Sequence, residues 1–258
     1  MLLLKLALVP VLVLLVSLAA RRWGHRVSGL LSAVPIIAGP ILFFMALDLG
    51  ADFTAETARA TLITLPALAA YLLAFGLIAR RAGWAASLFG GWAVFALVVT
   101  PLTAVPANAW QGLLVACAGF GGALLLLPRP VRPVNVAVIP NSEIALRMAA
   151  AFAITVIIAL GAQTFGPRVS GALLSFPIGG SVLPAFTRAL HGQDATLSLL
   201  RGFLLGLLPF AVFFYVLALL LPAYGIAIGF AGALAAVLAA HFVLIAIRRW
   251  RQRRSVCS

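Results

Sequence analysis

Long apolar stretches alternate with short segments rich in arginine, glycine and proline along almost the whole chain. Each stretch approaches the roughly 20 apolar residues that a membrane-crossing helix needs. The pattern therefore predicts an all-α polytopic membrane protein with about nine transmembrane helices. These spans are expected near residues 2–20, 27–48, 61–79, 85–102, 107–127, 145–165, 169–190, 199–221 and 224–247.

The chain also repeats itself, with an offset of 142 residues and no gap. Residues 24–54 and 166–196 share 12 identities over 31 positions, more than a shared apolar composition should give. Five spans, an odd number, separate each residue from its counterpart, so the two copies are expected to cross the membrane in opposite directions, as an inverted repeat. The predicted units are a first repeat of four spans (1–105), a connecting span with a proline-rich inner linker (106–142), and a second repeat with a basic tail (143–258).

The composition excludes most soluble classes of protein. Of the 258 residues, 64% are hydrophobic and 9% are charged, and the mean hydropathy is +1.19. A water-soluble domain cannot cover its surface with so little charge. The net charge of +13 would suggest nucleic acid in a soluble protein, but here the basic residues stand between apolar spans, where they set topology and contact lipid headgroups. We expect the lipid bilayer as a partner and no nucleic acid, with a homo-oligomer left open.

The basic residues predict the orientation of the chain. With the N-terminus outside, 15 of the 18 Lys and Arg residues fall on the inner side, and only Lys5, Arg59 and Arg168 fall outside. The positive-inside rule then places the C-terminus in the cytoplasm. The excess of arginine over lysine fits a GC-rich bacterial genome, so we expect a bacterial inner membrane. Residues 1–20 resemble a signal peptide, but their repeat partner cannot be cleaved and two arginines follow at once, so we expect them to be retained.

Two predicted spans, 27–48 and 169–190, carry proline and glycine near their middle. A proline removes a helix hydrogen bond, and freed backbone groups in lipid must find partners within the protein or a water-filled cavity. Under inverted symmetry the two breaks should meet at the midplane and form a substrate site, although such residues also serve simply to kink and pack helices. The predicted substrate-binding residues are Ser32, Pro35, Gly39, Pro40, Ser175, Pro177, Gly179, Gly180 and Ser181.

Matched charged residues flank these spans. Arg26 and Arg168 precede the broken helices, Arg59 and Arg201 begin the spans that follow them, and Asp52 and Asp194 lie in matching turns. The arginines fit either gates that attract an anion or pair with the aspartates, or interfacial anchors. The aspartates are expected to cap the following helices.

Other candidates for chemistry are few. His241, about 10 Å from the inner end of the last span, is a candidate proton relay or a hydrogen-bonded interhelical residue. No metal-ligand spacing, phosphate-binding glycine loop or catalytic triad pattern is present, and the two cysteines match no metal site. We therefore expect no enzyme activity, no cofactor and no metal.

The arrangement of each half resembles a known family. A leading span, a broken span that begins Arg26-Val27-Ser28-Gly29 and contains Pro35, then Arg59 and Gly90 in two further spans, is similar to the GlpM-type family of small bacterial inner-membrane proteins. That resemblance implies an inner-membrane location and a link to exopolysaccharide production. The segment 178–184 is similar instead to a repeat of the sulfite and organosulfur anion exporters, although the first copy is not.

These observations lead to two hypotheses about function. The first is transport of a small solute through a midplane site between spans 27–48 and 169–190, by rocking one repeat against the other. The second is a structural or accessory membrane subunit that assists envelope polysaccharide export. The sequence names no solute, coupling ion or direction.

Overall fold

The computed structural model describes residues 38–106, 108–131, 140–162 and 167–256, with isolated positions between 11 and 23. Within these residues every regular element is an α-helix. Glycines at 192 and 225 interrupt the last helix, so it consists of three stretches, 178–191, 193–224 and 226–256. The helices are α3 (Ala38–Leu49), α4 (Ala51–Ile78), α5 (Trp84–Ala104), α6 (Ala109–Leu126), α7 (Asn141–Ala162), α8 (Pro167–Leu174) and α9 (Ile178–Val256).

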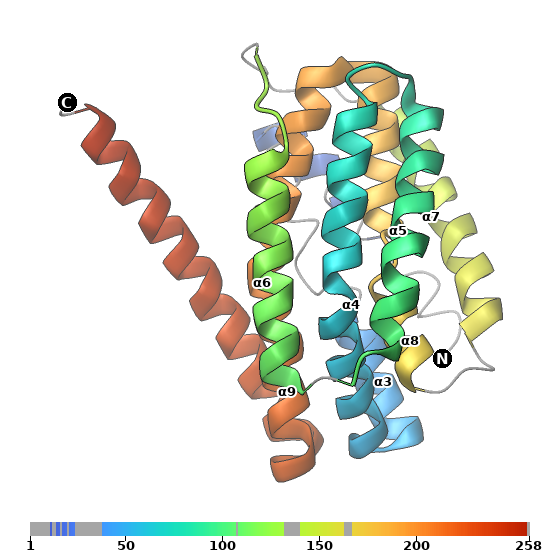
Figure 1. Ribbon diagram of the computed structural model, residues 1–258, viewed down its shortest axis with the longest axis vertical. Coiled ribbons are helices and arrows are strands. Elements are labelled where there is room, and N and C mark those ends of the chain that lie inside the picture. The colour runs from blue at the N-terminus through green and yellow to red at the C-terminus, as the bar shows by residue number, and fades with distance from the viewer. Residues whose placement is uncertain are drawn as a thin grey trace.

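Helix α4 forms the centre of the bundle and packs against α3, α5, α6, α8 and α9 (Figure 1). In its most apolar window 67% of the residues are buried, against 17% in α5 and 28% in α6. The two neighbouring helices are as apolar as a core helix, yet they direct large side chains such as Leu97 and Leu125 outward. A helix that is apolar on every side but only partly buried by protein suits a lipid environment.

Among the residues that the structure describes, four helices are long and apolar enough to cross a membrane by length and composition. They are α4, α5, α6 and the stretch of α9 from Gly180 to Val243. The described part of the chain is therefore that of an all-α, multi-pass membrane protein.

Most predicted spans coincide with helices, but several predicted boundaries are wrong. The middle stretch of α9 begins at residue 193, six residues before the expected start at 199, and its last stretch continues to Val256, nine residues beyond the expected end at 247. Helix α4 begins at Ala51, ten residues before the expected start at 61. The reason is that Gly50 alone makes the turn, with φ of 91°, a conformation that glycine adopts without steric cost. The chain is helical again at the next residue. The span expected at 2–20 and the first half of the one at 27–48 lie outside the described residues.

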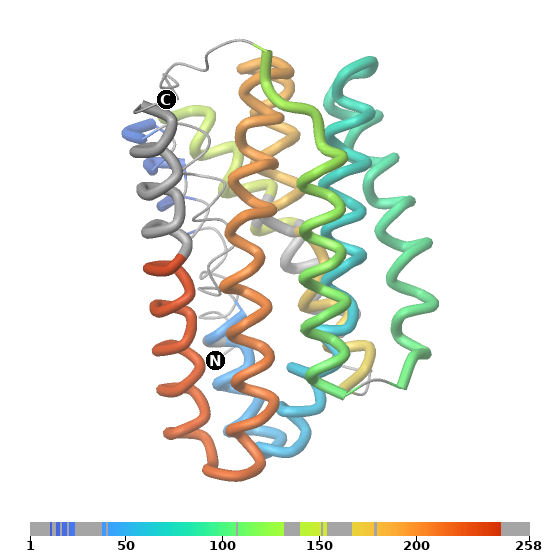
Figure 2. Tube along the Cα trace, turned by 60° about the vertical axis from the view of Figure 1, so that its left-hand side comes forward, coloured from blue at the N-terminus to red at the C-terminus, as the bar shows by residue number. Residues whose placement is uncertain are grey.

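Two turns that lie 142 residues apart have the same structure. Gly50 and Gly192 both have positive φ, 91° and 81°. The Thr54 hydroxyl donates to the Gly50 carbonyl at 2.9 Å, and the Thr196 hydroxyl donates to the Gly192 carbonyl at 2.8 Å. The helices that leave these turns run in opposite directions: α4 runs upward from Gly50, and the middle stretch of α9 runs downward from Gly192 (Figures 1 and 2).

Candidate functional site

The span expected at 169–190 is divided into two helices. Helix α8 ends at Leu174 and α9 begins at Ile178, so the chain leaves the helix immediately before Pro177. The freed groups find local partners: the Ser175 hydroxyl donates to the Ala172 carbonyl at 2.7 Å, and the Ser181 N–H donates to the Pro177 carbonyl at 2.6 Å. Such local bonds allow a broken helix to exist inside a bundle.

Two aromatic residues of the first half of the chain hold the start of α9. The Tyr71 hydroxyl donates to the Gly180 carbonyl at 2.9 Å, and the Trp92 indole N–H donates to the Ser181 hydroxyl at 2.8 Å. Tyr71 and Ser181 are almost completely buried. Phe176, in the break itself, packs against Trp92 with ring centroids 5.8 Å apart. The break is thus fixed by α4 and α5.

Neither aromatic residue was predicted. A sequence signal for them exists, because tyrosine and tryptophan inside apolar spans carry a donor that must find a partner when buried. The chain has only three tyrosines and five tryptophans. The sequence does not indicate the hydrogen-bond acceptor, because Tyr71 donates to a main-chain carbonyl.

A cavity of about 250 Å³ lies at the end of the bundle where α4 begins. We call it the arginine cavity. It lies between α4, α5, α8 and the segment that joins α5 to α6. It is lined by Glu56, Arg59, Ala60, Ile63, Thr64, Leu102, Thr103, Val105, Pro106, Asn108 and Arg168.

The break lies further along α4 than the arginine cavity does. Thr64, which lines the cavity, is seven residues from Tyr71, or about 10 Å at 1.5 Å per residue. On the neighbouring helix, Gly171 packs directly on α4, because a Cβ atom there would lie 2.8 Å from the Thr57 carbonyl oxygen. This contact places α8 beside the cavity, and Arg168 in the first turn of α8 lines it.

The positive and negative charges that line the arginine cavity do not balance. Arg59 forms an ion pair with Glu56 on the same helix. Arg168 is exposed and forms no ion pair within the described part of the chain. All five Asp and Glu residues of the protein are among the described residues, and none of them forms an ion pair with Arg168. The cavity therefore has one excess positive charge.

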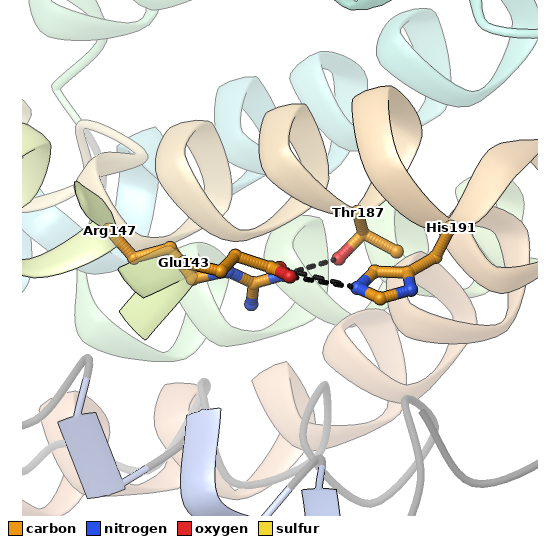
Figure 3. Close-up of polar contacts among 4 residues, drawn as sticks. All are labelled: Glu143, Arg147, Thr187 and His191. Carbon is orange, nitrogen blue, oxygen red and sulfur yellow. Dashed lines mark hydrogen bonds and ion pairs between the residues drawn. The ribbon is translucent and has the colours of Figure 1, made fainter. Parts of the chain in front are cut away.

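A second polar group is buried between α7 and α9 (Figure 3). Arg147 donates to the Glu143 carboxylate at 2.5 Å and to the Thr187 hydroxyl at 3.4 Å. The His191 Nε2 atom lies 3.3 Å from both oxygens of that carboxylate. Glu143 is 4% exposed and Arg147 is 1% exposed. A buried carboxylate needs such partners because its desolvation is costly. We call these four residues the α7–α9 cluster.

The α7–α9 cluster was not predicted, although Arg147 was expected on the inner side. Its members are spaced four residues apart on each helix, Glu143 with Arg147 and Thr187 with His191, which places each pair on one helix face. That spacing, in a chain with five acids, is the signal that could have found them.

Two arginines bind the C-terminal ends of other helices. Arg188 donates to the carbonyls of Ala79 and Ala82 at 2.9 and 3.0 Å, just after α4. Arg201, expected to be a gate or an anchor, donates to the carbonyls of Leu124 and Leu127 at 3.2 and 2.7 Å, at the end of α6. The last carbonyls of a helix lack partners within it and carry partial negative charge, so both contacts are favourable.

The other predicted residues lie apart from the arginine cavity. Gly39 and Pro40 are in the first turn of α3, and a Cβ atom on Gly39 would lie 3.8 Å from Phe213. Gly179 lies in the first turn of α9, next to the break. The His241 Nδ1–H donates a hydrogen bond to the Val237 carbonyl one turn earlier, at 3.1 Å. Three of the predicted residues, Arg26, Ser32 and Pro35, lie outside the described residues.

The predicted cap by Asp52 is wrong. The N-cap residue of α4 is Gly50, and no side chain caps that helix. Asp52 lies in the first turn, where its negative charge interacts favourably with the helix dipole but caps no particular N–H. The Asp194 carboxylate accepts a hydrogen bond from the Val131 N–H at 2.8 Å, so it holds the segment that follows α6.

Comparison of the chain with protein-family models, curated proteins and solved structures found no match.

Proposed function

We propose that this protein carries a small solute across a bacterial inner membrane, along the face of α4 between the arginine cavity and the break between α8 and α9. One observation supports this most strongly: a charged, solvent-open cavity adjoins the half-helix α8, whose other end is the break held by Tyr71 and Trp92. Discontinuous helices whose exposed backbone lies near the midplane are characteristic of transporter binding sites.

The proposed architecture is an inverted repeat of nine spans, N-out and C-in. The matching turns at Gly50 and Gly192 and the opposite directions of the helices that follow support it. Contacts exchanged between the halves support it too. Tyr71 lies against Gly180, and its counterpart 142 residues later, Phe213, lies against Gly39, the neighbour of the counterpart of Gly180. A two-fold axis relates contacts in this reciprocal way.

The distribution of arginines supports the orientation. Arg188 and Arg201 bind the ends of α4 and α6 that precede basic connections, whereas Arg59 and Arg168 line the cavity at the other end of the bundle. An excess of basic residues marks the cytoplasmic side. The arginine cavity then faces outward.

In the proposed mechanism, the stretch 178–191 of α9 moves relative to α8. Its inner end is held to α4 by Arg188 and to α7 by the α7–α9 cluster, and its outer end is the break. Rocking one repeat against the other would expose Ser181 alternately to the arginine cavity and to the inner side.

A flux screen with the purified, reconstituted protein tests this proposal. Proteoliposomes loaded with a mixture of small metabolites would be assayed by mass spectrometry for release of each compound, with wild type and Pro177→Ala in parallel. We expect release of at least one compound by wild type, and a larger loss of flux than of abundance in the variant, because the alanine restores a helix donor in the break. No flux for any compound, together with co-purification of a polysaccharide synthase, would favour the accessory role instead.

A further inference from the structure

We infer that the arginine cavity binds a small organic anion with a single negative charge, and that this anion is the solute transported. Only the identity of this anion with the transported solute rests on the proposed function. The binding of the anion depends on the charges and the size of the cavity.

The charge count determines the valence of the ligand. Glu56 and Arg59 form an ion pair and neutralise each other, so no described residue that lines the cavity supplies a counter-charge to the Arg168 guanidinium. A guanidinium offers several donors in one plane and binds a carboxylate or a similar oxyanion through two hydrogen bonds. One such group matches one negative charge, whereas a dianion would meet repulsion from the Glu56 carboxylate.

The remaining lining determines the size and polarity of the ligand. A cavity of about 250 Å³ is smaller than the roughly 300–1,000 Å³ pockets that hold drug-sized molecules. Thr64 and Asn108 add a hydroxyl and an amide, and Ile63 and Leu102 provide an apolar wall. This combination suits an anion of a few carbon atoms with a hydrogen-bonding group, and it offers little to a hydrated inorganic ion.

Lactate and lactamide are a suitable pair of probes, because they have nearly the same shape and differ in charge. Binding to the full-length protein in detergent would be measured from the thermal unfolding midpoint against probe concentration, at constant ionic strength. We expect lactate to stabilise the protein and lactamide to have little effect. Arg168→Gln should weaken lactate binding about tenfold to a hundredfold, since a hydrogen bond to a charged group contributes roughly 1.5–3 kcal/mol. Arg80→Gln, at another exposed arginine that follows α4, is the matched control and should bind lactate as wild type does.

A gain of function separates this reasoning from simple damage to the fold. Glu56→Gln removes the carboxylate and frees Arg59, so the cavity would have two uncompensated positive charges. This variant should bind malate, which adds a second carboxylate to lactate, more tightly than wild type does. Equal binding of lactate and lactamide, full lactate affinity in Arg168→Gln, or no gain for malate in Glu56→Gln would each overturn the anion site.

The uptake of radiolabelled lactate into proteoliposomes then separates the two proposals. Binding without uptake would leave the anion site intact and contradict its role in transport. Flux of other compounds without any lactate binding would leave the transport proposal intact and overturn this inference.

Discussion

Replacing Gly171 by alanine tests the contact between α8 and α4 on which the position of the arginine cavity depends. A Cβ atom at this position would lie 2.6 Å from the Ala60 Cβ, 2.7 Å from the Thr61 nitrogen and 2.8 Å from the Thr57 oxygen. Two of these three atoms belong to the main chain of the central helix, which cannot rotate away as a flexible side chain can. The two helices must therefore separate.

The size of the effect follows from two opposing terms. Overpacking of this kind costs roughly 1–3 kcal/mol or more, because backbone shifts are required. Alanine recovers roughly 0.5–1 kcal/mol relative to glycine within a helix. The net loss should be about 1–2 kcal/mol, or roughly 2–8 °C in Tm at 2–4 °C per kcal/mol for a chain of this size.

The assay is thermal unfolding of the purified protein in detergent. The fraction that remains monodisperse in size-exclusion chromatography is measured after heating at each temperature. Gly121→Ala in α6 is the matched control, because a Cβ atom there would meet nothing within 4 Å. The control should equal or exceed wild type in Tm, since only the helix propensity changes. If Gly171→Ala unfolds at the wild-type temperature, or if the control loses as much, the close packing of α8 on α4 is not what positions that helix.

Three further changes test other parts of the structure by the same thermal assay. Glu143→Gln leaves the Arg147 guanidinium buried without its ion pair and should cost about 3–5 kcal/mol. Replacing both residues by apolar ones of similar volume should recover most of that loss. A double variant whose loss equals the sum of the two single losses would contradict this. Trp92→Phe removes the donor to the start of α9 and should cost roughly 0.5–1.5 kcal/mol, and no change would mean that the bond contributes nothing. Gly50→Ala should cost roughly 1–3 kcal/mol, because φ of 91° with ψ of 166° is a conformation almost exclusive to glycine and no atom lies within 4 Å of the added Cβ. Gly83→Ala, at φ of −73°, should be neutral, and equal effects would exclude backbone conformation as the cause.

The lengths of the apolar runs were sufficient to predict several of the helices. Helices α5 and α6 lie within about two residues of the predicted spans, because an apolar run in lipid ends where polar or helix-breaking residues begin. The start of α4 could not be predicted in this way. Residues 51–60 contain Asp52, Glu56 and Arg59, which appear in the sequence as a polar loop, yet they continue the helix beyond its apolar part.

The candidate site was predictable in part. Proline and glycine near the middle of a span indicated where α8 and α9 separate, because a proline cannot complete the helix. The repeat identified Arg59 and Arg168 as candidates, because each has an arginine as its counterpart 142 residues away. Their meeting at one cavity follows from the packing of Gly171 on α4, a tertiary contact between distant segments.

The partners of the arginines were the least predictable feature, and the reason is physical. Arg188 and Arg201 bind main-chain carbonyls at the ends of α4 and α6, groups that every residue possesses and that no sequence pattern distinguishes. In a protein with 18 basic and five acidic residues, most positive charges cannot find a carboxylate, so helix C-termini become the available acceptors. Arg168 stands at the opposite end of the bundle, in the first turn of α8, where a helix exposes N–H groups rather than carbonyls. An arginine in that position has no acceptor from its own helix end, and a negatively charged ligand is the partner that its surroundings favour.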